Sequence, residues 1–159
     1  MQTSQDFWLE SLPEKIKDLV LQSLSLYERE KNQIETQDDY SFTVFPAAKA
    51  YEGFLKRYFF ELGLINKHTY EGKRFRIGRA LNPDIHPRGR DEYWLYDDLQ
   101  RKCGTEAAIE LWDTWLTCRN GVFHYFPLHD NTLSLDQAKK FIEKILGAIR
   151  LAQSCRRIA

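Results

Sequence analysis

The sequence predicts an all-α protein, a bundle of four or five main helices. Through several long segments the apolar residues recur at steps of three and four, a spacing that places them on one face of a helix. No long segment alternates apolar and polar residues as a half-buried strand would. The 159 residues are 43% hydrophobic and 14% aromatic, which supplies the core of a single domain over residues 1–159.

Two helices are expected in the first part of the chain. The first is a long amphipathic helix that follows Pro13 and runs to Lys31, because proline suits a first helical turn. Residues 32–41 show no periodicity and predict a loop. The second helix begins between Phe42 and Pro46 and ends near Gly63, since glycine commonly follows the last helical residue.

Three further helices are expected. A short one lies within residues 91–100, and a central one spans residues 105–126, with Thr105 as its N-cap. Within the central helix, Gly121 weakens the structure locally and permits a kink. The last helix follows residues 134–137, whose serine and glutamine form a capping box.

The composition excludes several classes of protein. Lys and Arg together number 23, as do Asp and Glu, so any affinity for nucleic acid must be local. The three cysteines, Cys103, Cys118 and Cys155, form no CxxC pair, which favours a reducing cytosol over a disulfide scaffold. The start of the chain lacks a signal-peptide pattern, and no apolar run could span a bilayer, so we expect a cytoplasmic protein without membrane contact.

One compact group of reactive side chains lies in the central helix. The predicted catalytic residues here are Arg119, His124 five residues later, and Asn120 next to the arginine. An arginine can bind a phosphodiester through two hydrogen bonds, and a histidine can transfer a proton near neutral pH. RNA supplies its own nucleophile, the 2′-hydroxyl, so we expect no metal or other cofactor. On a straight helix the two side chains would point about 140° apart, which makes a poor complete site within one chain.

The Arg-x-x-x-x-His segment resembles the HEPN ribonuclease family, closest in pattern to the HEPN domain of RNase LS-type bacterial toxins. A second segment, AAKAYEGFLK at residues 47–56, is similar to the second helix of these proteins. The resemblance implies that Lys49 and Glu52 join Arg119 and His124 at the active site, with Lys49 where an arginine is expected. It covers residues 40 to 155 and implies that two copies of the chain form one cleft.

A basic segment is the best candidate for binding RNA. Between Lys67 and Arg90, seven cations stand against two carboxylates, a local charge of +5. Tyr70, Phe75 and His86 interleave rings that can stack on unpaired bases. The residues predicted to bind RNA are Lys73, Arg74, Arg76, Arg79 and Arg88.

These observations predict a metal-independent endoribonuclease. The resemblance implies a homodimer that acts as the toxin of a toxin–antitoxin or phage-defence system, with a protein antitoxin as a possible partner. Two other functions fit the same sequence. One is a non-catalytic HEPN-like module that binds a partner protein such as an antitoxin or a nucleotidyltransferase, and the other is a plain helical structural domain.

Overall fold

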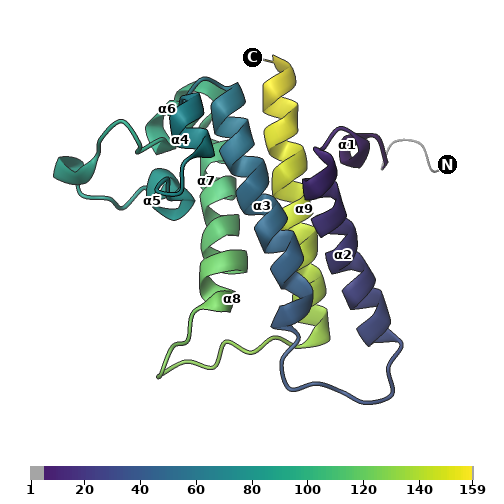
Figure 1. The fold of residues 1–159 in the computed structure, drawn as a ribbon. Coiled ribbons are helices and arrows are strands. Elements are labelled where there is room, and N and C mark those ends of the chain that lie inside the picture. The colour runs from purple at the N-terminus through teal and green to yellow at the C-terminus, as the bar shows by residue number, and fades with distance from the viewer. Residues whose placement is uncertain (1–5, 159) are drawn as a thin grey trace.

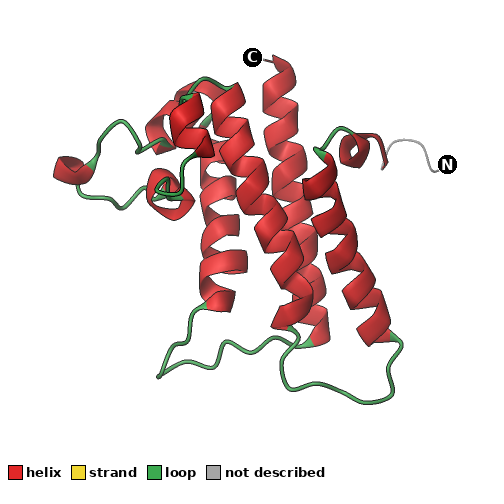
Figure 2. Cartoon of the chain, viewed as in Figure 1, coloured by secondary structure: helices red, strands yellow, loops and turns green. Residues whose placement is uncertain are grey.

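The computed structural model describes residues 6–158, which form helices joined by loops (Figures 1 and 2). Over this range there is no strand, and the all-α prediction is confirmed. No helix in it is long and apolar enough to cross a membrane. The elements are α1 (Asp6–Glu10), α2 (Glu14–Lys31), α3 (Ser41–Glu61), α4 (Lys67–Glu71), α5 (Ile77–Leu81), η1 (Pro87–Gly89), α6 (Tyr96–Cys103), α7 (Thr105–Trp115), η2 (Leu116–Asn120), α8 (Gly121–Phe123) and α9 (Leu135–Ile158).

The long helices α2, α3, α7 and α9 pack side by side (Figure 1). Between them lie large apolar side chains that solvent does not reach, among them Leu55, Phe59, Leu111, Ile142 and Ile145. Tyr51 is also fully buried, and its hydroxyl donates a hydrogen bond of 2.9 Å to the carbonyl of Leu111. This bond joins α3 to α7 and fixes how the two helices sit along each other, because an unpaired hydroxyl in the core would be costly.

Asp39 joins the two long connections at one end of the bundle. Its Oδ1 accepts hydrogen bonds from the backbone of Ser41 at 2.9 Å, the hydroxyl of Ser41 at 2.6 Å and the backbone of Leu133 at 3.1 Å. Partial burial favours the protonated acid, but these three bonds hold the pKa of Asp39 below its usual value. The loop between α8 and α9 is therefore anchored beside the start of α3.

The basic segment is attached to the bundle rather than free in solvent. It contains α4, α5 and η1 and projects to the left of the long helices in Figure 1. Phe75, Ile77 and Leu81 are buried in the common core. The buried apolar residues therefore fix the position of the cations between them.

Two details of the predicted central helix are wrong. The N-cap is Gly104, with a φ of 89° that favours glycine, and Thr105 is already the first helical residue. The helix ends at Phe123, three residues before the predicted end. In contrast, the capping box before α9 is confirmed, because Ser134 and Gln137 exchange hydrogen bonds of 2.8 and 3.2 Å.

The cysteines depart from the expectation of unpaired thiols. Cys103, at the end of α6, forms a disulfide with Cys155 of α9, although 52 residues separate them in sequence. Their Cα atoms lie 5.5 Å apart, which is a normal spacing for this bond. The third cysteine, Cys118, is free and buried. Two of the three cysteines are therefore paired although their number is odd, and the cysteines do not favour a reducing compartment.

Candidate functional site

A cationic hollow of about 530 Å³ lies among α3, α7–η2 and the segment from Lys73 to Ile85; we name it the inner hollow. Five cations and one carboxylate line it, an unusual excess in a chain whose overall charge is zero. The charged lining residues are Glu52, Lys56, Lys73, Arg76, Arg79 and Arg119. A hollow lined mainly by positive charge attracts anions.

Arg119 is held in place but remains accessible. Its Nη2 lies 4.0 Å from Oε2 of Glu52 on α3, and each of the two side chains is 35% exposed. The guanidinium carbon lies 5.2 Å from the ring centroid of Trp115, and Nη1 donates to Oδ1 of Asn120 at 3.3 Å. Glu52 also pairs with Lys56 at 3.4 Å. Arg119 therefore keeps donors free for an anion in the inner hollow, while its neighbours limit its motion.

A wide helical turn presents Arg119 to this hollow. Residues Leu116–Asn120 form a π turn, in which the backbone N–H of Gly121 donates to the carbonyl of Leu116, five residues earlier. A Cβ at Gly121 would lie 3.2 Å from that carbonyl oxygen, so glycine permits the turn. The predicted irregularity at Gly121 is therefore present, as a π turn that ends there rather than as a kink.

His124 lies apart from the inner hollow. It is the first residue after α8, with an extended backbone at φ −105° and ψ 142°, and its side chain is exposed. Its ring lies edge-on to that of Phe126, with a centroid distance of 6.4 Å. Nδ2 of Asn131 contacts the carbonyls of Gly121, Val122 and His124 at 2.9, 3.3 and 2.7 Å, which fixes the chain at this point. Within one chain the backbone of His124, the predicted proton carrier, is thus held in place, but His124 does not line the hollow that contains Arg119.

Lys49 occupies the same strip of α3 as Glu52 and also lies outside the hollow. Phe45, Lys49, Glu52 and Lys56 follow helical spacing along one face. At one end of the strip the ring of Phe45 packs edge-on against Phe123, with centroids 5.5 Å apart. Lys49 is exposed and makes no ion pair with the side chains of residues 7–155.

The predicted RNA-binding cations divide into three groups. Lys73, Arg76 and Arg79 line the inner hollow, and Arg74 lines a second hollow beside it. Arg88 lies in η1 and lines neither hollow. Arg79 binds Asp91 through two hydrogen bonds of 2.9 and 3.0 Å, which lower the pKa of Asp91. Part of the charge of Arg79 is therefore neutralised.

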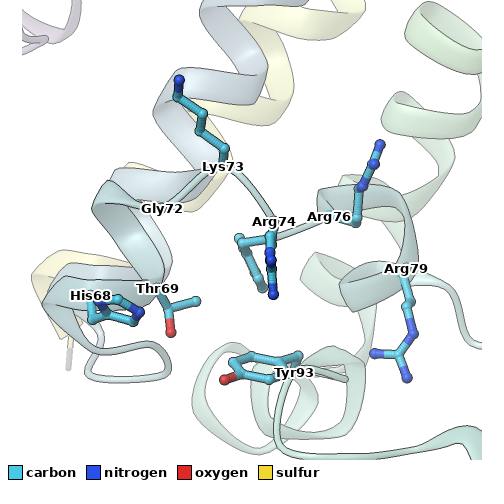
Figure 3. Close-up of a pocket in the computed structure, with 9 residues that line it drawn as sticks. His68, Thr69, Gly72, Lys73, Arg74, Arg76, Arg79 and Tyr93 are labelled. Carbon is cyan, nitrogen blue, oxygen red and sulfur yellow. The ribbon is translucent and has the colours of Figure 1, made fainter.

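The second hollow, named the outer hollow, has a volume of about 660 Å³. It shares Lys73, Phe75, Arg76 and Arg79 with the inner hollow, so the two are neighbours across one wall. Figure 3 shows Lys73 and Arg76 pointing away from Tyr93, whereas Arg74 and Arg79 point to its side.

The lining residues of the inner hollow that were not predicted as site residues include Lys56, Gly78, Trp112 and Trp115. Two of them carried a signal. Lys56 is on the charged strip of Glu52, and Trp115 lies one turn before Arg119. Gly78 carried none, because its role depends on a distant contact: a Cβ there would lie 2.8 Å from Nε1 of Trp115.

Two other chemistries lack support in this region. Burial raises the pKa of Cys118 to about 12, so this thiol, next to Arg119 in sequence, is not a nucleophile near neutral pH. In the part of the chain that the structure describes, no three His, Cys, Asp or Glu side chains are grouped to hold a metal ion. Comparisons of the chain with protein-family models, with curated proteins and with solved structures gave no match.

Proposed function

We propose that the protein is an endoribonuclease that cleaves RNA without a metal ion. One observation carries the proposal. Arg119, Asn120 and Glu52, which were predicted to be catalytic, line the same hollow as Lys73, Arg76 and Arg79, which were predicted to bind RNA. These residues come from three separate segments, so their meeting in a single cationic hollow does not follow from their proximity in sequence.

The chemistry follows from the charges of the inner hollow. A phosphodiester binds among the cations, and Arg119 stabilises the negative charge that builds on the phosphate oxygens. The 2′-oxygen of the preceding ribose forms a bond to phosphorus, and the bond from phosphorus to the 5′-oxygen breaks. A proton leaves the 2′-hydroxyl and another reaches the 5′-oxygen, with His124 as a carrier. The products are a 2′,3′-cyclic phosphate and a free 5′-hydroxyl.

The position of His124 supports a site shared between two copies. Beside it, aromatic and apolar side chains remain in solvent: Phe45 is 53% exposed, Tyr125 86%, Phe126 39% and Leu128 90%. Such a group of exposed apolar residues is typical of a surface that binds another protein. In a homodimer with twofold symmetry the same surface from each copy meets its equivalent, which would bring His124 close to a second chain.

We further propose that the protein is a ribonuclease of the HEPN type, acting as a toxin or in phage defence, with a protein antitoxin that blocks the inner hollow. The resemblance of residues 47–56 and 119–124 supports this assignment. The same exposed aromatic surface also favours a second function, a non-catalytic module that binds a partner protein. The two functions differ in one measurable property, because only the first requires RNA cleavage.

Purified protein is expected to cleave single-stranded RNA at an undiminished rate in excess chelator. The products should end in a 2′,3′-cyclic phosphate, because the 2′-hydroxyl is the nucleophile. His124→Ala should lower the rate by a factor of about 100 or more, since proton transfer contributes on this scale. Gel analysis of end-labelled RNA checks both results, with His129→Ala, another exposed histidine, as the matched control. A product with a 5′-phosphate, or a fully active His124→Ala protein, would contradict the mechanism.

Assembly can be tested by mixing active and inactive chains. We expect wild-type protein that has been co-refolded with an inactive His124→Ala chain to lose activity with the square of the wild-type fraction, because the single cleft of the dimer needs His124 from both copies. Two independent sites would give a linear loss. Sedimentation measures the oligomeric state at the same concentrations, and a fully active monomer would exclude a shared site.

A further inference from the structure

The outer hollow differs from the inner one in the chemistry of its lining. Surface from apolar atoms predominates in the outer hollow, whereas polar surface predominates in the inner one. Tyr93 lines the outer hollow and is 42% exposed, and its ring centroid lies 6.5 Å from that of the buried Phe75. The outer hollow therefore offers an accessible aromatic ring, that of Tyr93, which packs near the buried Phe75.

Cations surround this aromatic face. Figure 3 shows Arg74 projecting toward Tyr93, with Arg79 to one side and His68 and Thr69 opposite. Arg74 makes no ion pair with the side chains of residues 7–155, whereas Arg79 is paired with Asp91. The planar guanidinium of Arg74 and the ring of Tyr93 both belong to side-chain types that stack on nucleobases.

We propose that the outer hollow holds one unpaired nucleobase of the RNA strand whose phosphate binds in the inner hollow. The proposal rests on the proposed function, since it assigns a subsite of the same substrate. The shared wall of Lys73, Arg76 and Arg79 lies between the two, where the strand passes from base to phosphate. Tyr93 stacks on the base, Arg74 covers its other face or binds the adjacent phosphate, and Thr69 offers a hydroxyl to its edge.

This arrangement makes the enzyme selective for single strands. A base in a duplex is stacked and paired, and its extrusion has a free-energy cost that an unpaired base avoids. A base held in the outer hollow also sets which phosphate enters the inner hollow. The site of cleavage then depends on where an unpaired base stands in the RNA.

The proposal is tested by binding, without any need for cleavage. The probe is a fluorescent eight-nucleotide RNA whose 2′-O-methyl groups remove the nucleophile, together with a series in which one nucleotide at a time is abasic. For wild-type protein, loss of the base at one position should weaken binding about tenfold, while the other positions change little. Tyr93→Ala should weaken binding of the intact RNA to a similar extent and should make that position insensitive to loss of the base.

Variants separate stacking from charge and from misfolding. Tyr93→Phe keeps the ring and should bind as wild type does. Arg74→Ala should bind less tightly and show a smaller salt dependence, whereas Lys140→Ala, which removes an exposed cation from α9, should not. Thermal melts of each variant verify that the fold is retained.

Each contrary outcome has a definite meaning. An abasic series in which no position matters, with strong and salt-dependent binding, would refute the base subsite and leave the proposed function standing. Equal sensitivity of wild-type and Tyr93→Ala protein would place the base elsewhere and also refute the subsite. No binding of RNA at low salt would refute both the subsite and the proposed function.

Discussion

Replacement of Arg119 with alanine is expected to lower the rate of RNA cleavage by about 100- to 1000-fold, the usual effect of removing one group that stabilises transition-state charge. The expectation rests on position. Arg119 lies in the inner hollow between Glu52 and the face of Trp115, so its guanidinium is oriented before a substrate arrives. Its half-exposed side chain supports little of the core, and the variant should therefore fold.

The measurement is a single-turnover cleavage assay at saturating RNA, which separates a slower chemical step from weaker binding. Arg119→Lys keeps the charge but loses the paired donors, so its rate should lie between those of the wild-type and Arg119→Ala proteins. Arg57→Ala is the matched control, because Arg57 is an exposed arginine of α3 that pairs with Glu61 and does not line the inner hollow. An Arg119→Ala protein that is folded and as active as wild type would remove Arg119 from the mechanism.

The second large effect concerns stability. Reduction of the Cys103–Cys155 disulfide is expected to lower the free energy of unfolding by about 4 kcal/mol, because the bond closes a loop of more than fifty residues and so limits the unfolded chain. For a protein of this size, the midpoint of thermal unfolding should fall by roughly 8–16 °C. Calorimetry with and without a thiol reductant measures the shift.

The matched control is the Cys103→Ser, Cys155→Ser double variant, whose midpoint should be low and indifferent to reductant. Thiol titration gives an independent reading. Oxidised protein should show one reactive thiol after denaturation, that of Cys118, and none while folded, because this side chain is buried. Three thiols in protein purified without reductant, together with an unchanged midpoint, would contradict the disulfide.

The helices were predictable because their signals are local. Apolar spacing placed α2, α3 and α9, and the exchange of hydrogen bonds between Ser134 and Gln137 follows from a four-residue motif. The residues of the inner hollow were also partly predictable, since Arg119 and Glu52 lie in the two segments that carry the family resemblance. That they lie 4.0 Å apart depends on how α3 packs against η2, which no local signal reports.

The errors share a physical cause, which is contact between distant parts of the chain. The helix stops at Phe123, where the side-chain amide of Asn131 donates hydrogen bonds to the carbonyls of Gly121 and Val122. His124, the next residue, has an extended backbone. The π turn before Gly121 changes the direction of Arg119 in a way that regular spacing cannot anticipate. The disulfide joins α6 to α9, and a count of cysteines carries no information on such a pair.

The charge of the basic segment should affect how fast the protein associates with a polyanion. Residues 67–90 carry a net charge of +5, and the rest of the neutral chain must carry −5. This segment lies on one side of the bundle (Figure 1), so the charge of the molecule is unevenly distributed and gives it an electric dipole. In the field of a nucleic acid such a dipole turns the protein so that the hollows face the strand. Encounter should therefore quicken as ionic strength falls, even though a net charge of zero suggests no such acceleration.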